Sequence, residues 1–465
     1  IIYIYNMEQS SQAIVSGSSP QPTESQIPDL VKIGSIESDT VVDVETSYLE
    51  PVQHSQSTCR FRLENKGILH SNSKLVFSMT NPVSAQQCYF PVGVGVFALI
   101  KSARISSGGK TISEVQDVAH LTSYESMFLS PEHNAEREIF TTSRLMNRNL
   151  RYETNSSGAL SKGLYIDTLM DYSDRFTEYN IPGFLESEVE SQFQINLSDL
   201  FGFLKLQQLP LYMMNEQVTI DLEFNPSADR MFQTSAGSNT FNINTAETKL
   251  IADYIYFPQS MMEAYANANR NMTMTYMAYR LSKQTIDAGT ELKIRNIGGN
   301  GRIVTKIIAG LQDESLTGVT NPLLKYTSQA PAGANASSNG SITLNVKYNN
   351  HLLYPIDVDN YSHHQHNTAQ AQGMVPFVSR YEYCGEGTDA SFSSENFAES
   401  DMRAVFKGAF CWQAHRLNRN ERVNSRGIEY QATYNTNAGS RTSRIYLETV
   451  RMATLSDGKF NIVDA

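Results

Sequence analysis

The sequence predicts an all-β protein made of two β-sandwiches in tandem. Apolar and polar residues alternate over short runs, as in Val218–Phe224, and such alternation is typical of half-buried antiparallel strands. The 24 Tyr and 21 Phe residues also favour sheets. Strand-like runs occur on both sides of residues 258–272, which break the pattern. We therefore place a linker there, with one sandwich before it and one after it.

The expected strands are separated by turn signals such as Asn-Pro and Gly-Gly. Before the linker they are Val41–Val44, Cys59–Leu63, Lys74–Met79, Val92–Ile105, Val218–Phe224 and Leu250–Phe257. After it they are Thr273–Leu281, Glu291–Ile297, Ile303–Leu311, Ile342–Val346, Ala404–Cys411, Ile428–Thr433 and Arg444–Ala453. Helical periodicity is scarce, and short helices are expected only within Val115–Phe128 and Asp357–Gln370.

A faint internal repeat supports two related sandwiches. In each copy a strand is followed by a turn, two further strand residues and a polar segment that carries a tyrosine, Tyr124 or Tyr361. The offset from Glu114 to Tyr354 is 240 residues, about half of the chain. We expect a Ser/Gln-rich tail (1–37), a first sandwich (38–260) and a second sandwich (261–465). Long surface loops are expected at 313–340 and 386–400, which are rich in Gly, Ser, Ala and Asn.

Composition limits the partners of the chain. Charged residues make up only 18%, so either neighbouring subunits cover much of the surface or Ser, Thr, Asn and Gln supply its polarity. The net charge is −11. Because phosphate binding needs a basic face, we expect no specific recognition of nucleic acid. Residues 7–30 predict a tail that does not fold alone, and a tail that other chains hold in place favours an assembly.

Cysteines and apolar runs bear on the compartment. Cys59, Cys88, Cys384 and Cys411 have no short paired spacing, which predicts free thiols in a reducing compartment. No run reaches the roughly 18 apolar residues that a membrane helix needs. The opening Ile1–Tyr5 lacks the basic flank of a signal peptide, and Met7 is interpreted as a natural start.

The stretch Ile195–Phe224 resembles the middle of the major capsid proteins of nucleocytoplasmic large DNA viruses and their small relatives. In that family an apolar segment ending in aromatic residues precedes a Leu-Pro-Leu core, a spacer and an alternating strand, and here Leu209–Leu211 matches the core. The Gly-Gly turn at 108–109 and the ending Leu447–Val463 are similar to other parts of the family. The short chain and its Ser/Gln-rich start are most similar to the virophage and polinton-like branch. The aromatic cluster at Leu200–Phe203 lacks the Trp that larger relatives carry.

The resemblance implies two tandem jelly-roll β-sandwiches, a double jelly roll, with short helices and long loops. It implies a structural role as the major capsid protein of an icosahedral DNA virus, found in virions that assemble inside the host cell. Three chains would form a pseudo-hexagonal homotrimer, the capsomer, with the sandwiches upright and the two long loops facing outward. Its partners would be neighbouring capsomers, penton proteins and minor or cement capsid proteins.

Chemical motifs are weak, and we expect no catalytic, cofactor-binding or metal-ligating residues. The cluster His363, His364 and His366 is interpreted as a polar helix or loop, because no carboxylate or Cys pattern beside it completes a metal site. Asp357–Asn360 lacks the Gly and distal Glu of a calcium loop, so a helix cap is expected. Gly298–Arg302 lacks the Lys-Ser/Thr of a phosphate loop, so a hairpin turn is expected.

One basic run and three sequons leave alternatives open. The basic run consists of Arg416, Arg419, Arg422 and Arg426. It could line an inner surface that touches packaged DNA, remain a solvated loop, or form ion pairs between subunits, which we favour. The alternative function is a two-sandwich carbohydrate-binding or fibre protein, with sequons at Asn155, Asn335 and Asn339. A third is an enzyme acting on glycans, for which no acid/base set is found.

Overall fold

The computed structural model describes most of the β framework. The longer described ranges are 42–80, 94–126, 190–225, 241–286, 291–313, 341–374, 412–434 and 441–464, without 206–207, 359–360 and 418–420. Shorter described pieces are 88–89, 128–130, 133, 137, 140–141, 150–154, 160–165, 184–185, 232–233 and 326–327. The tail, Met7, the three sequon Asn residues and most of both long loops lie outside the described residues, as do Cys384, Cys411 and the strand expected at Ala404–Cys411.

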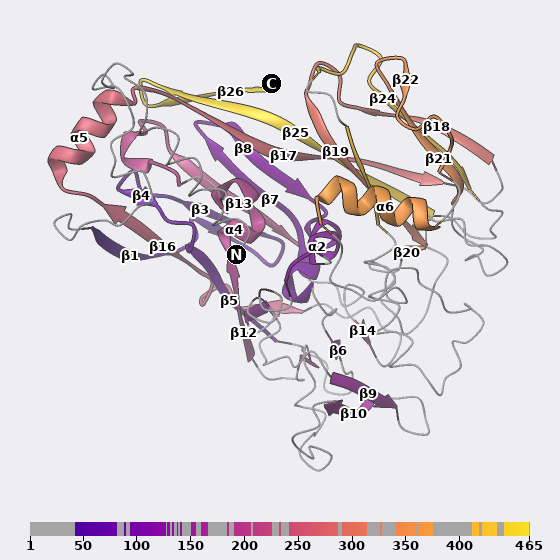
Figure 1. Ribbon diagram of the computed structural model, residues 1–465. Helices are drawn as coiled ribbons and strands as arrows, with labels where there is room; N and C mark the ends of the chain where they lie inside the picture. Colours follow the sequence, from indigo (N-terminus) through magenta and orange to yellow (C-terminus); the bar gives the residue numbers. More distant parts are fainter. Residues whose placement is uncertain are drawn as a thin grey trace, which may run out of the picture. The chain divides into compact units, whose positions relative to one another are not determined.

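Two antiparallel sheets form the first sandwich (Figure 1). The β1 sheet has the order β1-β16-β5-β12, with β4 beside β16 and β15 beside β5, and the β3 sheet has the order β2-β3-β13-β7-β8. Their bounds are β1 Asp43–Leu49, β2 Gln53–His54, β3 Thr58–Arg62, β4 Ile68–Leu69, β5 Lys74–Thr80, β7 Ile100–Ser107, β8 Lys110–Gln116, β12 Glu190–Asn196, β13 Val218–Phe224, β15 Asn242–Ile243 and β16 Lys249–Tyr256.

Smaller elements accompany these sheets. The short strands are β6 Cys88–Tyr89, β9 Leu150–Thr154, β10 Leu160–Tyr165, β11 Phe184–Leu185 and β14 Phe232–Gln233. The helices are η2 Gly95–Leu99, α2 Val118–Ser126, α4 Leu197–Leu200, η4 Gly202–Lys205 and η5 Leu211–Met213. In the core, the ring of Phe77 from the β1 sheet lies 5.7 Å from that of Phe224 in the β3 sheet. Burying such side chains stabilises the fold by about 1.5–3 kcal/mol each.

The second sandwich also consists of two sheets. The β17 sheet has the order β17-β25-β19-β20, with β23 beside β19 and β26 beside β25, and the β18 sheet has the order β18-β24-β21-β22. Their bounds are β17 Asn271–Ile286, β18 Glu291–Gly298, β19 Val304–Asp313, β20 Tyr326–Thr327, β21 Ser341–Tyr348, β22 His351–Leu352, β23 Gln413–Arg416, β24 Ile428–Tyr434, β25 Arg441–Ser456 and β26 Lys459–Asp464. Helix α6, Tyr361–Gln372, follows β22.

The two sandwiches share one strand order. In each half, eight of the described strands can be numbered along the chain: β1, β3, β5, β7, β8, β12, β13, β16, and then β17, β18, β19, β21, β22, β23, β24, β25. Within this numbering, one sheet of each half has the order 1-8-3-6 and the other has 2-7-4-5. This is the strand order of a jelly roll, in which nested antiparallel pairs wrap into two sheets. The predicted fold of two tandem jelly rolls is confirmed.

The internal repeat corresponds to equivalent places in the two jelly rolls. Hairpin β7–β8 precedes helix α2, and hairpin β21–β22 precedes helix α6. Both turns have two central residues with positive φ, Gly108 (54°) and Gly109 (81°) in the first and Asn349 (49°) and Asn350 (65°) in the second. Turns of this kind match the twist of the flanking strands.

Most expected strands are confirmed, with two corrections. Val92–Ile105 was expected to be one strand, but Gly95–Leu99 is a 3-10 helix and β7 begins at Ile100. All residues of Gly95–Leu99 are buried, so the spacing of apolar residues could not distinguish a helix from a strand there. Gly298–Arg302 is a turn with positive φ at its glycines, yet it is not a hairpin, because β18 and β19 belong to different sheets.

The linker contains helix α5, Gln259–Ala268, in which no residue is buried. It lies in Tyr256–Arg270, which is separate from one larger unit, Val44–Ile255 and Asn271–Ala465, that contains both jelly rolls. None of the described helices is long and apolar enough to span a membrane.

Candidate functional site: the junction between the two jelly rolls

Helix α2 of the first jelly roll is covered on all sides. Every residue of it is buried except Glu125, which is partly exposed. It packs on η2 and β7 of its own sandwich, and it also contacts the second sandwich through Ser123 and Tyr124, which both meet Trp412. Because no side of this helix faces bulk water, its sequence carries buried polar residues such as His120 and Ser123 without a separate polar stripe.

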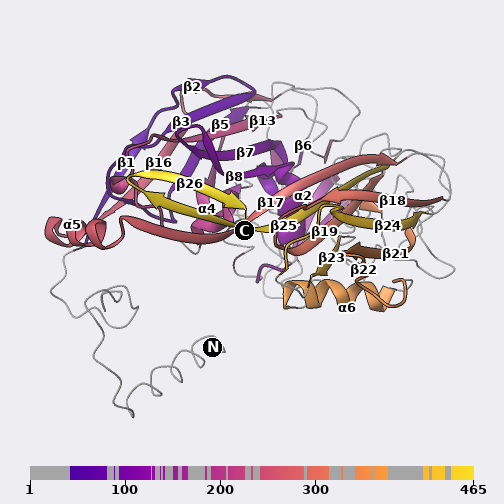
Figure 2. The same ribbon diagram turned by 90° about the horizontal axis from the view of Figure 1, so that it is seen from above.

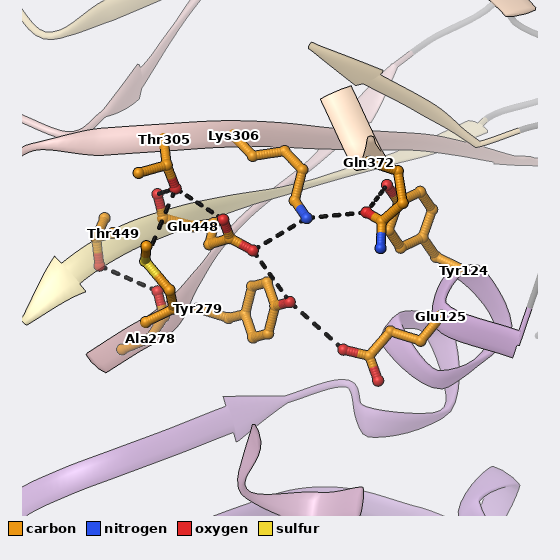
Figure 3. Close-up of polar contacts among 10 residues, drawn as sticks. Tyr124, Glu125, Ala278, Tyr279, Thr305, Lys306, Gln372, Glu448 and Thr449 are labelled. Carbon is orange, nitrogen blue, oxygen red and sulfur yellow. Dashed lines mark hydrogen bonds and ion pairs between the residues drawn. The ribbon is translucent and has the colours of Figure 1, made fainter. Parts of the chain in front are cut away.

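The β17 sheet presents different chemistry on its two faces. Alternate residues of β19 and β25, such as Ile307 and Leu447, point into the apolar core of the second jelly roll. The residues between them, such as Lys306 and Glu448, point the other way, toward α2 (Figure 3). The junction is therefore formed by the outer face of this sheet and helix α2.

A tryptophan anchors one end of the junction. Trp412 is 1% exposed, and its indole N–H donates to Ser123 Oγ of α2 at 3.1 Å. Its ring lies 6.2 Å from that of Tyr124 and 6.0 Å from that of Tyr446. Gly310 makes room for it, because a Cβ atom there would lie 2.5 Å from the indole ring. Buried aromatic pairs of this kind contribute about 0.5–1.5 kcal/mol beyond their buried area.

Ion pairs tie the start of α2 to the second jelly roll. Arg444 of β25 donates to Asp117 Oδ2 at 3.0 Å, and Lys283 of β17 lies 3.7 Å from the same oxygen. The hydroxyl of Tyr446 donates to the carbonyl of Asp117 at 2.9 Å. Burial raises the pKa of Tyr446 well above its ordinary value, so its hydroxyl stays protonated and can donate.

A polar network lies at the centre of the junction (Figure 3). Glu448 pairs with Lys306 at 3.1 Å, and both side chains are largely buried, at 13% and 11% exposed. Glu448 also accepts from Thr305 Oγ1 at 2.7 Å. Gln372 at the end of α6 accepts from Lys306 at 2.9 Å and from Tyr124 at 3.0 Å, so both helices meet this network.

Tyr279 lies between two carboxyl groups. Its hydroxyl is 3.3 Å from Glu448 and 3.4 Å from Glu125. Burial raises the pKa of Glu125, and it raises that of Tyr279 well above its ordinary value. A hydroxyl has one proton to give, so a protonated Glu125 would donate to Tyr279 while Tyr279 donates to Glu448. These contacts fix the side chain of Tyr279 between Glu125 of α2 and Glu448 of β25.

Hairpin β25–β26 extends the junction over the first jelly roll (Figure 2). The backbone N–H of Asn215 donates to the carbonyl of Gly458 in its turn at 2.8 Å. Lys110, the first residue of β8, donates to the carbonyl of Phe460 at 3.0 Å. Gly458 has a φ of 73°, and a Cβ atom there would meet the side chain of Asn215. Position 458 therefore requires glycine, because any larger residue would strain the backbone and clash with Asn215.

Two cavities flank the junction. One, of about 480 Å³, is polar: its lining includes Arg302, Arg451 and Asp464. Desolvation opposes ionisation of Asp464, yet hydrogen bonds from the two arginines lower its pKa. The other, of about 210 Å³, is more apolar and is lined by residues such as Leu121, Phe203 and Tyr276.

The sequence-derived candidate residues do not gather at this junction. His363 stacks edge-on against Tyr354 at 5.6 Å, whereas His366 is exposed and the side chain of His364 lies outside the described part. Among the residues that the structure describes, no group of three or more His, Cys, Asp or Glu side chains could hold a metal ion. Asp357 accepts from Asn345 at 2.7 Å, whereas Asp359 and Asn360, which directly precede α6, lie outside the described residues, so the helix cap stays a prediction.

The arginines of the basic run and the cysteines do not gather at the junction either. Arg416, Arg422 and Arg426 are exposed, Arg426 donates to Asn350 at 3.1 Å, and Arg419 is outside the described residues. Cys59 is a buried free thiol, and burial raises its pKa to about 12, which makes it unreactive. Cys88 lies in β6.

Comparison with known proteins places this architecture. No protein-family model matches the sequence, and no curated protein matches it. Solved structures do. A chain of the PBCV-1 virus capsid has a TM-score of 0.53 at 11% identity, covering 93% of this chain and 99% of that chain. A chain of the Sputnik virophage has a TM-score of 0.54 at 11% identity, covering 97% and 94%. The mavirus major capsid protein has a TM-score of 0.50 at 12% identity, covering 96% and 95%.

The fold is the double jelly roll of viral major capsid proteins. The similarity extends over nearly the whole of each chain, so it includes both jelly rolls and the segment that connects them. The resemblance first seen in Ile195–Phe224 is thereby confirmed for the fold. In this double jelly roll the segment supplies β12, the helices after it and β13.

The junction residues of the double jelly roll were missed by sequence reasoning. Lys306 and Glu448 lie within expected strands, at positions that alternate with core residues, and this alternation does not indicate whether the other face meets solvent or a second domain. A usable signal was the lone Trp412, since a single large aromatic residue rarely lies at a surface without a partner. Which surface it contacts depends on a partner 289 residues earlier.

Proposed function

We propose that this chain is the major capsid protein of an icosahedral DNA virus and that its role is structural and not catalytic. The observation that carries the proposal is the double jelly roll itself, shared along nearly the full length with capsid structures. Capsid proteins are the neighbours, which favours this role over a carbohydrate-binding or fibre protein and over an enzyme. The chain would then act in the virion.

The finer proposal is a homotrimeric, pseudo-hexagonal capsomer. Two jelly rolls with the same strand order let three chains present six similar sandwiches around one axis. Such a ring fills a hexagonal lattice with one protein. We take the sandwiches to be 38–260 and 261–465, preceded by the tail 1–37. Neighbouring capsomers, penton proteins and minor capsid proteins would be its partners, and the exposed arginines Arg416, Arg422 and Arg426 would form ion pairs between subunits.

Light scattering after size exclusion tests the capsomer directly. A mass near three times the 52.0 kDa chain is expected, together with a hexagonal outline in negative-stain micrographs. A protein that stays monomeric at high concentration and in crowding salts would contradict the capsomer, and glycan-binding screens would then test the alternative.

A further inference from the structure

The two jelly rolls differ in what covers the outer face of their 1-8-3-6 sheet. On the β17 sheet this face is covered by α2 of the same chain, through contacts such as Trp412 with Ser123. On the β1 sheet, Asp253 belongs to the partly exposed residues of β16 that alternate with buried ones, so it lies on the outer face. Thr46 of β1 forms a 2.7 Å hydrogen bond with Asp253 and therefore lies on the same face. Beside Thr46 on this face, Val44 is 55% exposed and Tyr48 is 68% exposed. Apolar side chains this exposed at a sheet edge are a feature of interaction surfaces.

Helix α6 is the counterpart of α2, and it too has an open side. Both helices follow the short hairpin of their jelly roll. Asn367 and Thr368 are buried, and Thr368 Oγ1 accepts from the backbone N–H of Ala414 in β23 at 3.2 Å. His366 and Gln370 are exposed. One side of α6 therefore lies on its own jelly roll, whereas another side is exposed at His366 and Gln370 among the described residues.

We propose that the outer face of the β1 sheet, at β1, receives helix α6 of a second copy of this chain. The proposal rests on the homotrimer proposed above. In a ring of three chains with nearly sixfold symmetry, the contact from a second jelly roll to the next chain's first jelly roll repeats the contact inside each chain. Inside the chain, α2 covers the outer face of the β17 sheet. Between chains, the repeated contact places α6 over the outer face of the β1 sheet.

Individual residues of β1 and α6 agree with this contact between copies. In the internal contact, the first strand of the sheet, β17, contributes Tyr279 and Lys283, which face Glu125 and Asp117 of the first jelly roll. The equivalent first strand of the other sheet is β1, and it carries the exposed Val44 and Tyr48. The polar sequence of α6 is no obstacle, because α2 is itself buried although it carries polar residues, and its Ser123, Tyr124 and Glu125 form hydrogen bonds across the junction.

Charge insertion into β1 tests the surface. We expect Tyr48→Glu and Val44→Glu to raise the concentration at which half of the protein is trimeric by roughly tenfold or more, as loss of an interface anchor does. Val463→Glu is the matched control, since Val463 is an equally exposed apolar residue, at 51%, on β26. Both side chains in β1 point into solvent in the single chain, so near-ultraviolet circular dichroism should stay unchanged.

Cross-linking between two single-cysteine variants tests the partner. Both variants are made in a background in which the four native cysteines, Cys59, Cys88, Cys384 and Cys411, are replaced by alanine. Tyr48→Cys and His366→Cys are then mixed, assembled and treated with a short bismaleimide. A cross-linked dimer in the mixture, and none when His366→Cys is mixed with Val463→Cys, supports the contact. If the wild type is trimeric yet neither the β1 charges nor the cross-link distinguish β1 from β26, this contact is overturned while the capsomer stands. A monomeric wild type would overturn the capsomer and this contact together.

Discussion

The two faces of the β17 sheet use the same strands for opposite purposes. On β25, Leu447 enters the hydrophobic core of the second jelly roll, and Glu448 beside it enters the junction, where it pairs with Lys306. The hydrophobic effect does not depend on the orientation of the groups that it buries. The core therefore supplies the free energy that folds the second jelly roll. Hydrogen bonds and ion pairs are directional, so the junction decides how that jelly roll meets the first one. The predictions that follow separate these two roles.

The largest effect is expected from Lys306→Met. It leaves Glu448 largely buried without its cation, which destabilises by about 3–5 kcal/mol in comparable buried pairs. The double variant Lys306→Met, Glu448→Leu should recover most of this, because no charge is then left unpaired. Urea unfolding measures both, with Lys283→Met as the exposed control, expected to change stability by about 0–1 kcal/mol. A double variant as unstable as the single one would show that the pair itself contributes the stability.

Next in size is Leu447→Ala, which should cost about 2–5 kcal/mol through lost burial and a cavity. Urea unfolding again gives the free energy. Because this side chain touches the core and not α2, the relative orientation of the jelly rolls should stay as in the wild type by small-angle scattering. A changed scattering profile with an unchanged free energy of unfolding would reverse the assignment of the two faces.

Gly310→Ala should destabilise by about 1–3 kcal/mol. The added Cβ would lie 2.5 Å from the ring of Trp412, so the indole must move away from Ser123. Tryptophan fluorescence reports on this directly, because Trp412 is the single tryptophan of the chain. Gly109→Ala is not a matched control despite its open space, since its φ is positive; Gly202→Ala is, with nothing within 4 Å and no positive φ. An unshifted emission spectrum in Gly310→Ala would count against tight packing at this anchor.

The smallest effect is a pH dependence. Burial raises the pKa of Glu125 from its ordinary 4.5, so its contribution to stability is complete below that value and is lost as pH rises through the folded-state pKa. Glu125→Gln, which stays uncharged, should remove this loss when urea unfolding is compared between about pH 5 and about pH 8. His415 acts in the opposite direction, because burial lowers its pKa to about 3, but it is present in both proteins and cancels in the difference. Equal pH profiles for variant and wild type would contradict the raised pKa of Glu125.

The sequence predicted the strands better than the contacts between them. β13 has the expected bounds because its alternating residues are buried on one face only. The end of β8 and the start of α2 were merged into one expected helix, since the sequence gives no periodic signal at Asp117, where φ is positive. The junction was beyond prediction because its pairs, such as Arg444 with Asp117, lie 327 residues apart. An outward strand residue looks the same in sequence whether it faces water or another jelly roll.

The pairing of β17 with β25 has a consequence for synthesis. The two strands pair from Asn271 with Ser456 to Ile286 with Arg441. The first strand of the second jelly roll, β17, therefore cannot form this pairing until β25 has been synthesised. The strands of the first jelly roll are complete by Tyr256 and can fold while translation continues at about 5–20 residues per second. Loop closure over such separations is slow. A nascent chain therefore carries a finished first jelly roll with its α2 uncovered, and the junction over α2 can form only after β25 has left the ribosome.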